Sequence, residues 1–317
     1  ASKSAVPRDR RYVGSKETFA YILDDIAQSF NIGKYDDVFK MTILKISLNL
    51  QSFTNLIIGI WDIINDLFLA SIVDRTRTRW GKFKPWLVVY AIPGVLITVI
   101  YWALPMFYGT TGIGSSIGKF IPYFVLQIFS NLAASLIAIV RQGMTSTITP
   151  NIIDRTRLIT SANLLSGFVE KAPEILMGLL IDIYINNPDN KILEIVDNGA
   201  YQLGYSRLFV IGGVTAVVSG LFALFYALVA KERVMQTVDR PSVFSGVKSV
   251  ITNKPLLLIT LSEFLGAFSL NSGTNLYYIN VLNFASMATV VGIPGAVVSP
   301  LSYSYVPWAR KRFSTKA

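Results

Sequence analysis

Residues 61–86 read WDIINDLFLASIVDRTRTRWGKFKPW, and this stretch decides the fold. Its first part continues an apolar run at residues 56–60, its middle is a dense basic turn, and another apolar run begins after Pro85. The pattern predicts two membrane-spanning helices joined by a short, positively charged loop. Asp62 and Asp66 lie well inside the first apolar run. At that depth an acid costs at least about 2.5 kcal/mol and normally faces a bundle interior or a wet cavity.

The composition indicates a membrane protein. Of its 317 residues, 52% are hydrophobic and 15% are charged, whereas soluble proteins carry about 25% charged residues. Apolar runs of roughly 20 residues favour helices over the shorter alternating strands of a barrel. We therefore predict an all-α, polytopic helical bundle in a lipid bilayer.

The residues that are missing exclude several kinds of chemistry. Cysteine and histidine are both absent, so the chain has no disulfide framework, no thiolate chemistry and no histidine-based metal or acid–base site. No catalytic signature such as GxSxG occurs, so we predict neither an enzyme nor a cofactor. Basic loops at a cytoplasmic membrane face account for the net charge of +10 without a nucleic-acid partner.

The apolar runs predict eight spans, with a polar loop at 186–206 after the fifth. The first span is polar enough that an interfacial helix remains an alternative to a helix lining an aqueous cavity. Basic loops follow the even-numbered spans, so the positive-inside rule places both termini in the cytoplasm, as expected for a multi-pass protein of the cell membrane. The predicted spans are 18–39, 42–73, 86–107, 120–142, 158–185, 208–230, 255–284 and 288–306.

The long basic connector after the sixth span divides the chain. We expect an N-terminal six-helix half with its tail at residues 1–230, a cytoplasmic connector at 231–254, and a partial second half of about two helices at 255–317. Repeated six-helix halves are the plan of a large transporter superfamily.

In order and spacing, residues 62–66 and 74–86 resemble the glycoside–pentoside–hexuronide:cation symporters of the major facilitator superfamily, with weaker similarity at 150–158 and 300–313. Members normally have twelve helices, so we expect a fragment truncated after about eight. The resemblance implies cation-coupled symport of a sugar, glycoside or similar small polar solute by alternating access. The alternative is a membrane sensor or interaction protein that kept the transporter fold without transport.

In that family, two acids four residues apart on helix two help to bind the coupling cation, and Asp62 and Asp66 occupy those positions beside Asn65. Independently, residues i and i+4 share a helix face, so both carboxylates can converge on Na⁺ or Li⁺, or one can take up H⁺. The alternative is that neighbouring Asn and Thr groups satisfy them. The family's helix-four acid falls near Arg141 and Gln142, where this chain has no carboxylate.

Two interpretations of Arg141 stay open: it pairs with Asp62 or Asp66 in place of the cation, or it lies at the cytoplasmic end near lipid phosphates. A cluster at Glu170, Lys171 and Glu174 either lines the cavity or neutralises itself, since Lys171 and Glu174 are three residues apart. The family's sugar-binding arginine on helix five falls near Asn163. The predicted solute-binding residues are Asp25, Arg141, Gln142, Asn163 and Lys171.

The basic loop resembles the superfamily's cytoplasmic gate motif. The resemblance implies that Asp74 and the arginines form ion pairs in one transport state and lose them in the other; binding to acidic lipid is the alternative. The predicted gate residues are Asp74, Arg75, Arg77, Arg79, Gly81 and Lys82.

Overall fold

The computed structural model describes residues 11–108, 117–234, 252–266 and 274–312. Within these ranges the chain is helical, apart from turns and one isolated bridge between Thr78 and Gly81. The elements are α1 (Ser15–Ser29), η1 (Gly33–Tyr35), α2 (Asp36–Val38), η2 (Phe39–Ile43), α3 (Leu48–Arg75), α4 (Lys84–Tyr108), α5 (Ile117–Thr147), α6 (Ile152–Val169), α7 (Ala172–Asn186), α8 (Pro188–Val196), α9 (Asn198–Leu208), α10 (Val210–Val229), α12 (Lys254–Gly266), α13 (Thr274–Asn280) and α14 (Met287–Arg312).

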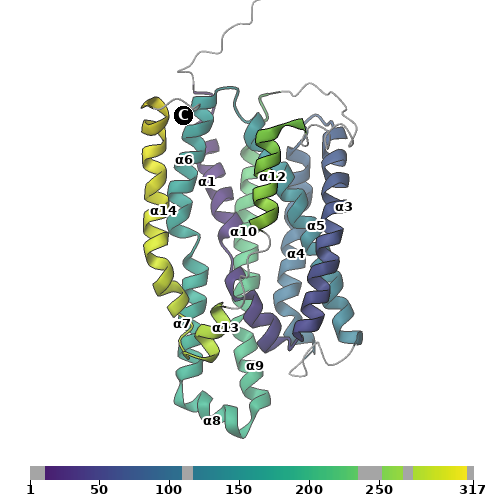
Figure 1. Ribbon diagram of the computed structural model, residues 1–317, viewed down its shortest axis with the longest axis vertical. Helices are drawn as coiled ribbons and strands as arrows, with labels where there is room; N and C mark the ends of the chain where they lie inside the picture. The colour runs from purple at the N-terminus through teal and green to yellow at the C-terminus, as the bar shows by residue number, and fades with distance from the viewer. Residues whose placement is uncertain (1–10, 109–116, 235–251, 267–273, 313–317) are drawn as a thin grey trace, which may run out of the picture.

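The long helices lie side by side along the long axis of the molecule (Figure 1). Their contacts run in the order α14, α6, α1, α10, α4, α5 and α3, so α14 and α3 occupy opposite edges of the bundle. Helix α1, which forms the first part of the first predicted span, therefore packs within the bundle between α6 and α10.

The first two predicted spans are not continuous helices over their predicted lengths. The first span, 18–39, is interrupted after Ser29, where α1 ends, and helical structure resumes with η1 at Gly33. The second was predicted from residue 42 but begins at Leu48, because Lys45 adopts a left-handed conformation with φ of 52° and separates η2 from α3. The Ser47 side chain then accepts a hydrogen bond from the Leu50 amide and caps α3.

The predicted fifth span, 158–185, is two helices rather than one. Pro173 stands in the first turn of α7, where it lacks an amide donor and its ring would clash with a carbonyl four residues earlier, so α6 ends at Val169. The prediction of a polar loop at 186–206 is wrong: Asn187 caps α8 and Asp197 caps α9, and both segments are helical.

Among the residues that the structure describes, three helical stretches are long and apolar enough to cross a membrane: Lys84–Tyr108, Ile117–Thr147 and Asn198–Val229. Some of the other predicted spans do not meet this condition for two reasons. Helix α3 carries the acids Asp62 and Asp66 within its apolar run, and the first and fifth spans are each divided into shorter helices. Part of the predicted seventh span, residues 267–273, lies outside the described residues.

Two clusters of buried apolar side chains lie at opposite ends of the helical bundle. One is aromatic, and its Phe39 ring lies 4.7 Å from that of Trp102 and 5.1 Å from that of Phe209. The other joins the start of α4 to the ends of α5 and α10 through Phe83, Met144 and other buried apolar side chains. Packing at both ends leaves the polar side chains of the middle of the bundle to line cavities.

Candidate functional site

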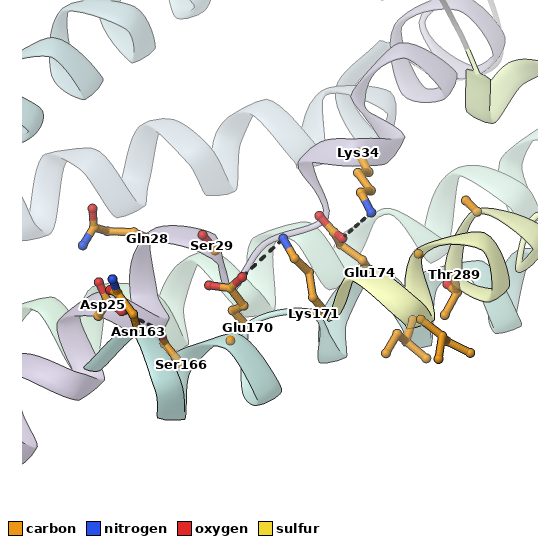
Figure 2. Close-up of a pocket in the computed structure, with 16 residues that line it drawn as sticks. Asp25, Gln28, Ser29, Lys34, Asn163, Ser166, Glu170, Lys171, Glu174 and Thr289 are labelled. Atoms are coloured by element: carbon orange, nitrogen blue, oxygen red, sulfur yellow. Dashed lines mark hydrogen bonds and ion pairs between the residues drawn. The ribbon is translucent and has the colours of Figure 1, made fainter. Parts of the chain in front are cut away.

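A charged cavity of about 410 Å³ lies between α1, the junction of α6 with α7, and α14. Figure 2 shows its polar side chains, which come from both sides of the breaks in the first and fifth predicted spans. Three of the predicted solute-binding residues, Asp25, Asn163 and Lys171, are among them. The polar residues that line the charged cavity are Asp25, Gln28, Ser29, Lys34, Asn163, Ser166, Glu170, Lys171, Glu174 and Thr289.

Most charges in this cavity have a partner within it. The Ser166 hydroxyl donates to the Asp25 carboxylate at 2.5 Å. The Lys34 ammonium lies 3.2 Å from Glu174 and so joins η1 to α7 across the two breaks (Figure 2). Three carboxylates face two ammonium groups, so the lining retains an excess of acceptors for hydroxyl donors.

The predicted pairing of Lys171 with Glu174 is wrong. Lys171 lies 3.5 Å from Glu170, and Glu174 pairs with Lys34. Glu174 is instead taken by Lys34, which approaches from η1 across the helix breaks, and Lys171 pairs with its neighbour Glu170.

Arg141 lies in neither of the two places that the sequence suggested. Its guanidinium donates to Asp24 of α1 at 2.7 Å, with side-chain exposures of 18% for Arg141 and 5% for Asp24. It also lines a second cavity of about 510 Å³, the interior cavity, which lies between α1, α4, α5 and α10. Gln142 is exposed and lines neither of these two cavities, so the structure does not bring it together with the other predicted solute-binding residues.

The two acids of α3 have different surroundings. Asp62 is half-buried, and its Oδ2 accepts a hydrogen bond from the Asn131 amide of α5 at 3.3 Å. Asn65 is buried, with 5% of its surface exposed, and Asp66 is exposed. Within the part of the chain that the structure describes, no group of three or more Asp, Glu, His or Cys side chains gathers as a metal site. In that part of the chain, Asp62 Oδ1 and Asn131 Oδ1 are buried without a hydrogen-bond partner, whereas the unpartnered atom of Asn65 is its donor Nδ2.

The predicted gate loop is held by a residue that the sequence did not single out. The carboxylate of Glu232, just beyond α10, accepts hydrogen bonds from the amides of Lys82, Phe83 and Lys84 at 2.9, 2.8 and 2.8 Å. Gly81 has φ of 111°, and a Cβ there would lie 2.4 Å from the Glu232 carboxylate. The glycine is therefore required by both its backbone conformation and the close approach of Glu232.

Within the loop, Asp74 pairs with Lys82 at 2.6 Å rather than with an arginine. Arg75, Arg77 and Arg79 are exposed, and the Arg79 guanidinium stacks over Trp80 at 5.6 Å. A second contact fixes the same end of the bundle, where Glu17 of α1 pairs with Arg233 at 2.6 Å.

The spacing of residues gave no signal for these contacts. Glu232 is 150 positions from Lys82, and Asn131 is 69 positions from Asp62. A polar residue on α5 opposite an acid on α3 can be recognised only when the two helices are seen together.

Comparison with known proteins gives the family. The family described as MFS/sugar transport protein matches residues 28–317, nearly the whole chain. The chain belongs to this family. Membership confirms the predicted all-α fold of the major facilitator type, and a family of transport proteins agrees with the prediction that the chain is not an enzyme.

Individual relatives in the sugar transport family are distant. The chain is 27% identical to a lactose permease of Leuconostoc lactis over 261 residues, which cover 79% of this chain and 38% of the permease. It is 24% identical to an uncharacterized symporter of Bacillus subtilis (strain 168) over 257 residues, 80% of this chain and 51% of the relative. An isoprimeverose transporter of Lactiplantibacillus pentosus is 22% identical over 325 residues, which cover 100% of this chain and 63% of the transporter. The chain spans about half the length of the curated relatives it matches.

Proposed function

We propose that the protein carries a sugar, glycoside or similar small polar solute across the cell membrane by cation-coupled symport, with the charged cavity as its solute site. The observation that supports this most directly is the coincidence of two helix breaks with a polar cavity. In secondary transporters, solute sites form at discontinuous helices near the middle of the bilayer. Here the breaks after α1 and after α6 meet at the cavity and are joined by Lys34 and Glu174.

The size and chemistry of the charged cavity suit a hydroxylated solute. Its volume of about 410 Å³ falls in the range of small-molecule sites. Carboxylates accept hydrogen bonds from hydroxyls, and amides such as Gln28 and Asn163 both donate and accept. The names of the relatives, which include a lactose permease and an isoprimeverose transporter, support a sugar as the solute.

For the coupling cation, Na⁺, Li⁺ or H⁺, we propose the α3 residues Asp62, Asn65 and Asp66. An acid within an apolar helix that meets a polar side chain of a neighbouring helix is the usual setting of an ion path. Both termini would lie in the cytoplasm, with residues 1–230 as one half of the carrier, 231–254 as its connector and 255–317 as the start of the other half.

The loop after α3 would serve as the cytoplasmic gate. Its three exposed arginines and the exposed Asp74, which pairs with Lys82, are available for exchange between partners, while Glu232 holds the adjoining start of α4. Alternating access then consists of rocking one half against the other, with this loop making and breaking ion pairs.

The test is solute uptake by vesicles that carry the protein, with an imposed Na⁺ or H⁺ gradient and a panel of labelled sugars. Asp25→Asn should lower uptake about tenfold or more, because a hydrogen bond to a charged group contributes about 1.5–3 kcal/mol. The matched control is Asp189→Asn on α8, an exposed acid that does not line the charged cavity, which should leave uptake unchanged.

Equal uptake by the Asp25 and Asp189 variants would remove the charged cavity from the solute path. Uptake that ignores both ion gradients would remove the coupling.

A further inference from the structure

One carboxylate joins the two proposed halves of the chain at the end of the bundle opposite the basic loop. Asp182 lies on α7, and its two oxygens accept hydrogen bonds from the backbone amides of Ala285 and Ser286, the latter at 2.8 Å. These two residues directly precede α14 and lie 103 and 104 positions further along the chain. Figure 1 shows the lower ends of α7 and α14 next to each other, beside α13.

Through this contact, Asp182 caps α14 from a different helix. The first amides of a helix have no acceptor within it, and the positive end of the helix dipole favours a negative charge. Ala285 and Ser286 are only 1% and 7% exposed, so water has little access to replace the carboxylate. Removing the Asp182 carboxylate would therefore leave two buried amides without their acceptor, which weakens the contact between α7 and α14.

A glycine on the same face of α7 allows the close approach. Gly178 precedes Asp182 by four residues, so the two share one side of the helix. A Cβ at Gly178 would lie 3.4 Å from the Ser286 Cα and 2.5 Å from the Tyr35 hydroxyl oxygen. A small residue is thus needed where α7 meets both η1 and the start of α14.

Helix α13 makes a second polar contact at the same end. The Asn275 side chain of α13 donates to the Lys34 carbonyl of η1 at 2.5 Å. The Lys34 ammonium pairs with Glu174 in the charged cavity. Ile279 of α13 is also buried in the aromatic cluster, with 4% of its surface exposed. Both α13 and the start of α14 are therefore docked on the first proposed half here.

The capped helix forms one wall of the charged cavity. Thr289 follows Ser286 by three residues, and it lines the cavity together with Gly292 and Ile293. Figure 2 shows Thr289 on α14, on the side of the cavity where Lys34 meets Glu174. Because α14 supplies this wall, its distance from α7 determines whether the cavity is closed at the end where Asp182 lies.

We infer that Asp182 is a positioning residue of the solute site, which caps α14 and thereby keeps the charged cavity closed at the end opposite the basic loop. In the proposed orientation this end faces the outside of the cell. The inference rests on the proposed function, because it takes the charged cavity as the solute site. It adds a residue that does not line the cavity and that influences the side to which the cavity opens.

The test uses the absence of cysteine from the chain, because a single introduced cysteine is then the only thiol. Gly292→Cys is suitable, since Gly292 lines the cavity and a Cβ there meets no described atom within 4 Å. A membrane-impermeant maleimide is applied to right-side-out and to inverted vesicles that carry the protein. The ratio of the outer to the inner labelling rate is the readout, and the amount of folded protein does not change that ratio.

Asp182→Ala, combined with Gly292→Cys, should raise the outer-to-inner ratio at least about tenfold, since two hydrogen bonds to a charged acceptor are lost. Asp182→Glu keeps the carboxylate and should restore most of the original ratio. Asp182→Asn keeps the shape and one acceptor oxygen, and should raise the ratio even if the alanine variant does not fold. The matched control is Asp189→Ala, an exposed acid of α8 at the same end, which should leave the ratio unchanged.

An unchanged or lowered ratio in the alanine and asparagine variants of Asp182 would overturn the inference, and so would an equal rise with Asp189→Ala. Labelling requires no transport, so its result is separate from sugar uptake. Uptake that depends on Asp25, together with a labelling ratio that ignores Asp182, would remove Asp182 and leave the proposed function standing. Equal uptake by the Asp25 and Asp189 variants would instead remove the solute site, whatever the labelling ratio.

Discussion

Helix α5 meets a buried or half-buried carboxylate on each of two sides, and the two carboxylates are treated differently. On the α1 side, Asp24 is 5% exposed and receives the Arg141 guanidinium at 2.7 Å. On the α3 side, the one donor to Asp62 among the residues that the structure describes is the Asn131 amide at 3.3 Å, and Asp62 Oδ1 has no partner there. A carboxylate with a full countercharge is fixed in the structure, whereas one without it remains available to an exchangeable ion.

The largest effect is expected from the fixed pair. Arg141→Met leaves the Asp24 charge buried without a partner, which should destabilise the protein by about 3–5 kcal/mol. The measurement is chemical unfolding of the purified chain, followed by circular dichroism.

The control for that pair is the double variant Arg141→Met with Asp24→Asn, which removes both charges and should recover most of the loss. A single variant that costs less than about 1 kcal/mol, the range of exposed pairs, would mean that Asp24 and Arg141 are no more fixed than surface charges.

A third carboxylate, Glu232, extends the comparison to one that is satisfied by backbone amides instead of a countercharge. Glu232→Ala should cost about 1.5–3 kcal/mol, because the three amides at the start of α4 lose a charged acceptor. The exposed Glu194→Ala on α8 is the control and should change stability by no more than about 0.5 kcal/mol. Equal unfolding of both variants would contradict the role of Glu232 as a cap.

Removing the charge of Asp62, the carboxylate without a countercharge, should affect stability in the opposite direction to removing the charge of Asp24. In a buffer free of Na⁺ and Li⁺, Asp62→Asn should leave stability unchanged or raise it by about 1 kcal/mol, since a poorly compensated charge is removed. Asp24→Asn should lower stability under the same conditions, because it strands Arg141. Unfolding curves of the two asparagine variants check this directly. If both substitutions change stability in the same direction, the two carboxylates on either side of α5 do not differ as argued.

The smallest effect is expected in the gate loop, where Asp74 is exposed while its partner Lys82 has a side-chain exposure of 19%. Asp74 is 63% exposed in its pair with Lys82, so Asp74→Asn should change stability by about 0–1 kcal/mol, and added salt should diminish even that. Thermal unfolding at low and high salt is the measurement. A larger, salt-independent loss would show that the Asp74 pair resembles the Asp24 pair.

Local patterns in the sequence predicted several of these features. The depth of Asp62 and Asp66 in an apolar run and the basic turn after them follow from residue order alone. The likeness to symporters pointed to Asp25 and Asn163, and the charge cluster in the fifth span pointed to Lys171; the structure brings all three to one cavity. Pro173 and Asn187 carried signals for the break before α7 and for the start of α8, and both signals were missed because the fifth span and the polar loop were judged by hydropathy.

The sequence by itself determined the helical bundle, its basic loop and the presence of acids within it, because burial of apolar runs in lipid and the need to satisfy every backbone group leave few alternatives. Only the tertiary structure decided which acid is neutralised. Asp24 and Arg141 are 117 positions apart, and Asp62 and Asn131 are 69 apart. The partner of a buried charge depends on which helices pack together and how they are rotated, and neighbouring residues along the chain do not encode that choice.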